Sequence, residues 1–328
     1  MSKLYNSCYG LHLKQFVDMK RTLGFKYKTQ AVILYQIDRL AEETEESSHG
    51  ITKEFADKWC KKRCYEADFY RYTRISLLAS FSSYLRDLGI DSYIPKLPRY
   101  QPHTFIPYIY SPKEIESILN ACDDLRLAKA FRSSDLLVMP VLIRLLYATG
   151  LRIGEALSLK RQDVNLNENW LRVKDSKNGK ERIIPISNSL TSVCTQYATY
   201  RDMLSVTAQK SPYFLVGVGG KKCSQQAVRA WFKRCLRIAR ISYVSRNRLP
   251  RVHDLRHTFA VSSLASMAEA GIDLYVSLPV LSTYLGHQSI EGTNHYVRLT
   301  ARMYPELLKD VDTICLDVFP KYKNYEAD

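Results

Sequence analysis

Short segments of the chain combine arginine, histidine and tyrosine at spacings that suit chemistry on an anion. Residues 148–155 read ATGLRIGE, in which a glycine ends one predicted helix and Arg152 opens the next. Backbone N–H groups at a helix start and a guanidinium can converge on one anion. Residues 253–257 read HDLRH, and residues 285–287 read LGH, nine residues before Tyr296. Together they offer cations, a base and a phenolic nucleophile.

A predicted hairpin adds a further cation. The β-rich runs 170–175 and 181–186 are joined by residues that include Asn178-Gly179, a pair typical of tight hairpin turns. Lys177 precedes this turn and would lie near the tip of a short ribbon. Taken singly, each such residue also has a structural interpretation, because a hairpin lysine or one of 23 tyrosines is ordinary in a folded protein. Only the combination favours chemistry.

The two histidines of the HDLRH segment raise the alternative of a metal hydrolase. His253 and His257 are four residues apart, so on a helix they share a face, as two zinc ligands would. However, Asp254 stands where the zinc-protease pattern has glutamate, and Arg256 would bring a cation against the metal. We therefore expect no metal here, and chelator-sensitive activity would indicate the alternative.

The charge balance indicates a polyanionic partner. The 328 residues include 48 Lys+Arg and 33 Asp+Glu, for a formal net charge of +15, and 46% of them are hydrophobic, enough for a sizeable core. Segment 221–256 holds eleven basic residues and one acidic residue, an excess of +10. Such concentration favours nucleic acid over an anionic membrane surface. The residues expected to contact DNA phosphates here are Lys221, Lys222, Arg229, Lys233 and Arg237.

Targeting signals and cysteine pattern bear on the compartment. No N-terminal stretch resembles a signal peptide, and the longest apolar run, 135–151, is interrupted by Arg144 and a proline. The eight cysteines are scattered and do not resemble a disulfide scaffold. We expect a soluble, cytoplasmic protein with reduced cysteines and no membrane contact.

Prolines mark a predicted domain boundary. Five of the twelve prolines lie between residues 95 and 112, and because proline fixes φ and removes a donor, we expect an extended linker at 95–111. Before it, apolar residues at helical spacing predict a small bundle over 1–94 with helices at about 9–23, 29–46, 52–66 and 70–88. After it, 112–328 is predicted to be mainly α with a small antiparallel sheet. Residues 111–114 match a capping box with proline at the first helical position, so a helix is expected to start after Ser111. Further helices are expected before Gly150 and at about 189–208, 225–240, 254–269, 277–285 and 291–300.

Aromatic and basic residues alternate between positions 65 and 74 of the first predicted domain. A helix with this pattern suits contact with a phosphate backbone, and we expect Arg71 and Arg74 to bind DNA. Amphipathic packing inside the bundle explains the same residues, so both interpretations stay open.

Taken together, these segments resemble the tyrosine recombinases, also called the phage integrase family of site-specific DNA recombinases. The motif-bearing part extends from about residue 111 to residue 304. The resemblance implies a helical core-binding (SAM-like) domain at 1–94 and a catalytic domain with a tail helix at 112–328, forming a C-shaped clamp on DNA. It implies that the catalytic residues are Arg152, Lys177, His253, Arg256, His287 and Tyr296, with Glu155 in support and Lys180 the alternative to Lys177.

The family mechanism implied by this resemblance needs no cofactor. Tyr296 attacks a phosphodiester and leaves a 3′-phosphotyrosyl bond, while the two arginines and His287 stabilise the five-coordinate phosphorus. A phenol has a pKa of about 10, so it needs a base or a positive field, and His253 is the candidate base. The departing 5′ oxygen needs a proton, for which Lys177 is the candidate acid.

The resemblance also implies a homotetramer on two double-stranded recombination sites, acting in integration, excision or transposition of a mobile element. It implies that the protein works in the cytoplasm, at the bacterial nucleoid. A DNA-binding protein that has lost catalysis is an alternative, which the complete residue set disfavours. A type IB topoisomerase-like relaxase is another, and an apolar tail at 303–319 slightly favours assembly over that monomeric class. The tail could dock on a neighbouring protomer or on its own domain. The interval from Arg256 to His287 is longer than usual in the family, which predicts a loop or helix extension around 275–281.

Overall fold

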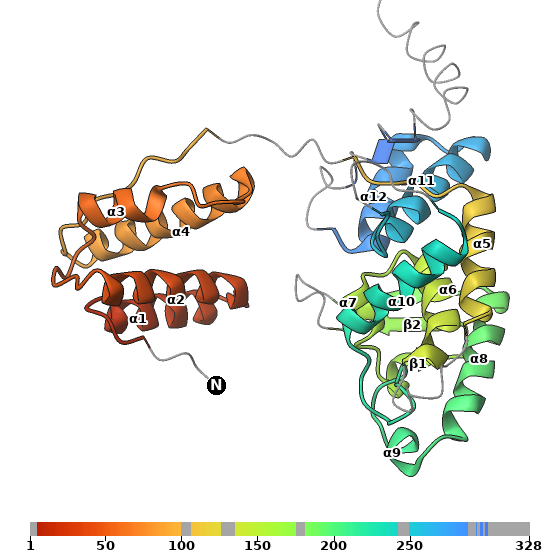
Figure 1. The fold of residues 1–328 in the computed structure, drawn as a ribbon. Coiled ribbons are helices and arrows are strands. Elements are labelled where there is room, and N and C mark those ends of the chain that lie inside the picture. Colours follow the sequence, from red (N-terminus) through yellow and green to blue (C-terminus); the bar gives the residue numbers. More distant parts are fainter. Residues whose placement is uncertain are drawn as a thin grey trace, which may run out of the picture. The chain divides into compact units, whose positions relative to one another are not determined.

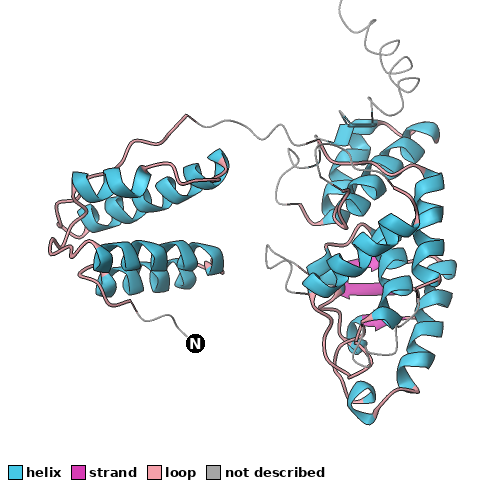
Figure 2. Cartoon of the chain, in the orientation of Figure 1, coloured by secondary structure: helices cyan, strands magenta, loops and turns pink. Residues whose placement is uncertain are grey.

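The chain forms two compact units in the computed structural model, one over residues 1–105 and one over 106–328 (Figure 1). The division lies within the predicted proline-rich linker. Both units are mainly helical, and the strands belong to the second (Figure 2). The structure describes residues 5–99, 106–125, 135–174, 181–241, 249–287, 293, 296–297 and 299–300.

In the first unit, the described residues 5–99 form four helices: α1 (Gly10–Thr22), α2 (Lys28–Glu43), α3 (Lys53–Cys60) and α4 (Asp68–Asp87). They confirm the four expected helices, although α3 ends earlier than predicted because Lys61 leaves helical geometry with ψ of 132°. Their apolar faces bury an aromatic core in which ring pairs such as Phe16 and Phe81 meet edge to face at 5.6 Å. Other members of this core are Tyr9, Phe55 and Trp59.

The second unit combines helices with a three-stranded antiparallel sheet of order β1-β2-β3, which confirms the predicted fold class. Strand β1 was not expected, since two residues are too few to show an alternating pattern. The described elements of the second unit, in which η marks a 3₁₀-helix, are α5 (Pro112–Asp123), η1 (Leu136–Val138), α6 (Met139–Thr149), α7 (Ile153–Ala156), η2 (Arg161–Asp163), β1 (Val164–Asn165), β2 (Trp170–Val173), β3 (Arg182–Pro185), α8 (Asn188–Asp202), α9 (Val206–Gln209), α10 (Gln225–Ile238), α11 (Asp254–Glu269) and α12 (Leu274–Leu285).

Local signals explain where several of these elements begin. The Ser111 hydroxyl accepts a hydrogen bond from the Glu114 backbone N–H, and Glu114 bonds back to the Ser111 N–H, so a capping box starts α5 as predicted. Just before it, Tyr110 donates its backbone N–H to the Thr258 hydroxyl and its own hydroxyl to the Arg251 carbonyl, at 3.0 and 3.2 Å. These bonds hold the start of the second unit against α11.

The predicted insertion around 275–281 lies within helix α12, so it is helical and not a loop. The helix contains Pro279 and packs against α11. Its C-terminal end at Leu285 is followed directly by Gly286 and His287, which belong to the candidate site. The longer interval therefore leads into the site through a helix.

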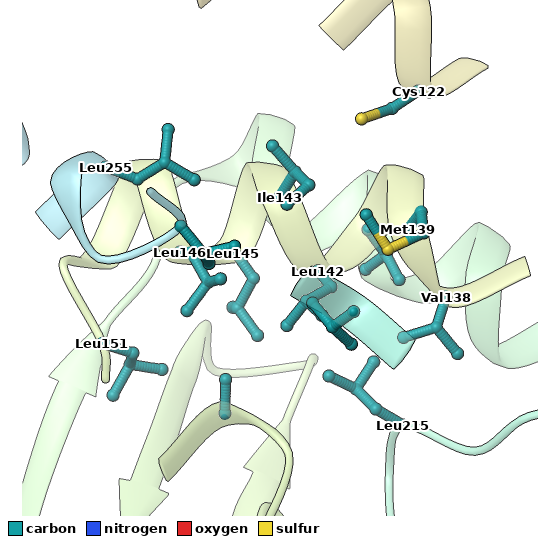
Figure 3. Close-up of a cluster of buried hydrophobic side chains, with 14 of the residues drawn as sticks. Cys122, Val138, Met139, Leu142, Ile143, Leu145, Leu146, Leu151, Leu215 and Leu255 are labelled. Atoms are coloured by element: carbon teal, nitrogen blue, oxygen red, sulfur yellow. The ribbon is translucent and has the colours of Figure 1, made fainter. Parts of the chain in front are cut away.

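Helix α6 lies in the middle of the second unit's core. It packs against α5, α8, α10 and α11, which is why apolar residues occupy nearly all of its faces. Burial of each such large aliphatic side chain contributes about 1.5–3 kcal/mol. Figure 3 shows the core cluster of buried side chains, with Leu142, Leu145 and Leu146 of α6 near Leu151, Leu215 and Leu255.

In the part of the chain that the structure describes, no helix has the length and apolar character needed to cross a bilayer.

Candidate active site

A sharp turn after α6 places the first arginine of the site. Gly150 ends α6 with φ of 60°, and Arg152 then becomes the N-cap residue of the short helix α7. A side chain at Gly150 would put its Cβ 2.5 Å from the Phe259 ring, so both the backbone angle and the space require glycine. The turn therefore holds Arg152 beside α11.

Three arginines from different elements meet at the C-terminal end of α12. The backbone carbonyls of residues 284, 285 and 286 accept hydrogen bonds, in that order, from Arg182 Nε at 2.8 Å, Arg256 Nη2 at 2.9 Å and Arg152 Nη2 at 3.2 Å. The last carbonyls of a helix lack intrahelical partners and carry partial negative charge. The end of α12 therefore gathers cations from β3, α11 and the start of α7.

Glu155 lies between two of these arginines. Its carboxylate accepts hydrogen bonds from Arg152 Nη1 at 2.9 Å, from Arg182 Nη2 at 2.8 Å and from the Arg152 backbone N–H at 3.0 Å. Burial of this side chain, which is 6% exposed, disfavours its charged form, but the guanidinium groups of Arg182 and Arg152 hold the pKa of Glu155 below its ordinary value. The carboxylate is therefore charged at neutral pH and offsets part of the local positive charge.

Arg256 is the most deeply buried cation of the site. The residue is 2% exposed, and its Nη1 donates to the Gly150 carbonyl at 2.7 Å. Burial, followed by the nearby charge of Arg152, lowers the pKa of Arg256 to about 10. The guanidinium is thus still protonated at neutral pH and supplies a fixed positive charge in a region of low dielectric.

Tyr296 lies within this cluster, and its hydroxyl is 3.0 Å from Nδ1 of His257. The sequence suggested His257 only as a ligand in the metal alternative, and His253 was the expected base. The spacing of four, there considered for a metal, puts both histidines on one face with ring centroids 4.8 Å apart. Burial raises the pKa of Tyr296, and the Arg256 guanidinium acts in the opposite direction.

His253 and His287 are both held neutral. Burial, which disfavours the charged imidazolium, and then the charge of Arg256 lower the pKa of each to about 4. His287 stacks on Tyr296 with ring centroids 6.0 Å apart, and its Nδ1 lies 2.8 Å from the Thr293 hydroxyl. At neutral pH neither ring adds positive charge, so the field on Tyr296 comes from the arginines.

The predicted lysine and the metal alternative have different outcomes. Lys177 and Lys180 lie outside the described residues, so the candidate acid stays a prediction. Among the residues that the structure describes, no group of three or more histidine, cysteine, aspartate or glutamate side chains is arranged to hold a metal ion.

The sequence analysis did not identify Arg182, at the start of β3, as a site residue. The signal that could have found it is a charged residue at the start of a predicted strand.

The basic residues of the second unit that are expected to contact phosphates are all exposed. On α10 they recur every four residues, so they share one side of that helix. A Cβ on Gly154 of α7 would lie 3.2 Å from the side-chain amide of Gln225, so the first turn of α10 lies beside the turn that carries Arg152. The exposed residues are Lys221, Lys222, Arg229, Lys233 and Arg237.

The expected DNA contact by Arg74 in the first unit is wrong. Arg74 is 0% exposed, and its Nε donates to Glu66 Oε1 at 2.8 Å. Its guanidinium also lies over the Trp59 ring, 4.9 Å from the centroid. Packing inside the bundle therefore explains this residue. Arg71, whose Nε donates to the Cys60 carbonyl at 3.1 Å, is half-buried, and its contact with DNA stays a prediction.

Comparisons with known proteins agree on one family. The model of the phage integrase family matches residues 109–303. The chain is 30% identical over 304 residues to the integrase/recombinase y4rB of Sinorhizobium fredii, covering 91% of this chain and 94% of that protein. Its fold resembles XerH site-specific recombinase in a post-cleavage complex with its difH substrate, with a TM-score of 0.60, 18% identity and coverage of 88% and 79%. It also resembles a lambda integrase tetramer bound to a Holliday junction, with a TM-score of 0.56, 14% identity and coverage of 85% and 76%.

Proposed function

Because the chain belongs to the phage integrase family, we propose that it is a site-specific tyrosine recombinase that cleaves and rejoins DNA through a 3′-phosphotyrosyl intermediate. The observation that supports this most is the position of Tyr296. Its hydroxyl contacts a histidine, and its ring lies against His287 beside the arginines gathered on α12. A buried phenol in such a positive field is suited to nucleophilic attack on a phosphodiester.

The first chemical step joins the Tyr296 oxygen to phosphorus and breaks the bond from phosphorus to the 5′ oxygen. The phenolic proton leaves toward His257, whose Nδ1 lies beside the Tyr296 hydroxyl. His253, the base that the resemblance implies, lies next to His257 on the same face. The departing 5′ oxygen takes a proton, for which Lys177 stays the candidate donor. The new phosphotyrosyl ester keeps the energy of the broken bond, so a 5′-hydroxyl from another strand can reverse the step without a metal or nucleotide cofactor.

The arginines would lower the barrier to that step. The five-coordinate phosphorus carries extra negative charge on its non-bridging oxygens, and fixed cations placed in advance stabilise it without reorganisation. Arg152 and Arg256 are held by backbone carbonyls, and Arg152 also by Glu155, so their positions do not depend on substrate. His287, neutral and stacked on Tyr296, would donate a further hydrogen bond.

Double-stranded DNA is the proposed partner. The exposed basic face on α10 starts beside Arg152, so it can hold phosphates next to the cleavage point, with affinity that falls as salt rises. We propose a homotetramer on two recombination sites, supported by the likeness to the lambda integrase tetramer. We place its action in integration or excision of a mobile element at the bacterial nucleoid.

A nicked DNA substrate carrying the terminal sequence of the mobile element tests the proposal, because loss of the short 5′ fragment traps the covalent adduct. The wild-type protein should form an adduct that resists denaturant and chelator, whereas Tyr296→Phe should form none. Tyr200→Phe is the matched control, since it removes the same hydroxyl from an exposed position on α8. An adduct with Tyr296→Phe would exclude Tyr296 as nucleophile. DNA binding by wild type without any adduct would indicate a non-catalytic member of the fold.

A further inference from the structure

Taking the proposed function as the premise, we propose that Arg182 is a positioning residue for DNA cleavage. It joins the base of the β2–β3 hairpin to Glu155 and to the end of α12, and so holds Arg152 and His287 in place. Arg182 belongs to β3, whereas its partners belong to α7 and α12. It thus links three elements of the second unit around the site.

All three nitrogens of the Arg182 guanidinium are engaged. Nη2 and Nη1 donate to the two carboxylate oxygens of Glu155 at 2.8 and 3.3 Å, and Nε donates to the Tyr284 carbonyl at 2.8 Å. The side chain is 10% exposed. A planar guanidinium can bond a carboxylate with two nitrogens and a carbonyl with the third, whereas a lysine ammonium cannot reproduce this geometry. The site therefore specifically requires arginine at this position.

The guanidinium also packs against the chain at Gly286. A Cβ added there would lie 2.9 Å from Arg182 Nη1 and 3.1 Å from Cζ, and Gly286 has φ of 69°. The Gly286 carbonyl accepts Arg152 Nη2, and the next residue is His287. A displaced Arg182 would therefore disturb the support of Arg152 and the start of the segment that carries His287.

Arg182 is less exposed to solvent than Arg152, the arginine that it supports. The Arg152 side chain is 25% exposed, while that of Arg182 is 10% exposed and has its carboxylate and carbonyl partners inside the protein. Glu155 bonds both arginines, so it transmits the position of one to the other. This arrangement indicates that Arg182 acts through Arg152 and Glu155 and does not itself touch the phosphate.

The place of Arg182 in the sheet extends this link to the hairpin. Arg182 pairs with Val173 at one end of the β2–β3 ladder, and these two residues flank the segment that contains Lys177 in the chain. The bonds to Glu155 and Tyr284 therefore anchor the base of the hairpin to the carboxylate that also bonds Arg152 and to the end of α12, where the other two arginines bond the next carbonyls. These bonds fix the position of strand β3 relative to Arg152 and Arg256.

Single-turnover cleavage of the nicked substrate at saturating DNA, together with the DNA Kd, tests this role in the full-length protein. For Arg182→Gln we expect cleavage to slow by about 10²-fold, the effect of a small misplacement of catalytic groups, with an unchanged Kd. Arg182→Lys should recover only part of the rate, because an ammonium cannot hold Glu155 and Tyr284 together. A purely structural role would instead lower the amount of folded, DNA-binding protein and leave the rate of the bound fraction unchanged.

Arg144→Gln is the matched control. Arg144 also bonds a carboxylate with two nitrogens, at 2.8 and 2.6 Å to Asp123 of α5. It also bonds the Pro140 carbonyl at the start of α6, whereas the site follows the other end of that helix. Its cleavage rate should equal that of wild type. In the Glu155→Gln background, Arg182→Gln should slow cleavage much less than in wild type, since the shared carboxylate is gone.

Three results would overturn the inference: a wild-type rate in Arg182→Gln, full recovery in Arg182→Lys, or equal effects of Arg182→Gln with and without Glu155. If Arg182→Gln does not fold, the rate in Arg182→Lys decides. Failure of the proposed function is a different outcome, because wild type itself would then form no adduct.

Discussion

Replacement of Glu155 by glutamine removes one negative charge from between two guanidinium groups and leaves the side-chain shape almost unchanged. The carboxylate is 6% exposed and bonds Arg152 and Arg182 at 2.9 and 2.8 Å. Removal of one partner from a buried ion pair costs about 3–5 kcal/mol. Glutamine still offers one oxygen as an acceptor, so we expect the lower end, about 3 kcal/mol. For a unit of this size, that corresponds to a fall in Tm of about 6–12 °C.

The dependence on pH tests the cause of this effect. The pKa of Glu155 in the folded protein lies below its ordinary value of 4.5. Its charge therefore stabilises the fold above that pH, and the contribution is lost as pH falls through the lower folded value. Calorimetry should show a constant difference in Tm between wild type and Glu155→Gln at neutral pH and a shrinking difference below pH 4.5. His253 and His287 occur in both proteins, so comparing the two isolates Glu155.

Asp123→Asn provides the comparison for a pair nearer the surface. Asp123 is 45% exposed and bonds Arg144, and exposed pairs contribute about 0–1 kcal/mol. Its Tm should therefore fall far less than that of Glu155→Gln. The reasoning would be refuted by an unchanged Tm of Glu155→Gln at neutral pH. A difference that persisted unchanged in acid would show that the charge is not responsible.

Three further substitutions address the nucleophile, the first unit and the DNA-binding face. His257→Phe keeps a ring but removes the nitrogen at the Tyr296 hydroxyl, so adduct formation should slow by about 10²-fold at unchanged Kd; an unchanged rate would deny that contact a role. Arg74→Met leaves Glu66 buried and without this partner, so urea unfolding should show a loss of about 3–5 kcal/mol in the first unit, and a neutral effect would contradict the buried pair. Lys233→Gln should reduce the slope of log Kd against log salt by about 1 without changing Tm, and an identical slope would exclude a phosphate contact.

Much of the fold follows from local sequence. Periodic apolar residues predicted the four helices of the first unit, and a capping box predicted the start of α5. The two β-rich runs were predicted to pair as a hairpin, and β2 and β3 do pair antiparallel, while the turn residues Asn178-Gly179 lie outside the described residues. Elements with weak local signals were missed or misjudged: β1 has only two residues, and α3 ends at Cys60 although the pattern continues. Helix and strand formation depends largely on neighbouring residues, so these errors occur where neighbours carry little information.

The sequence by itself determined the residue types of the site and their order along the chain, since both belong to local motifs. It could not show that Arg74 faces inward, because aromatic and basic neighbours suit a DNA surface and a buried ion pair equally well. Nor could it show which histidine meets Tyr296, since both occupy one face of α11. Only the tertiary structure decided that three arginines bond three successive carbonyls at the end of α12. These bonds join residues 134, 102 and 29 positions apart, and such contacts depend on how distant elements pack.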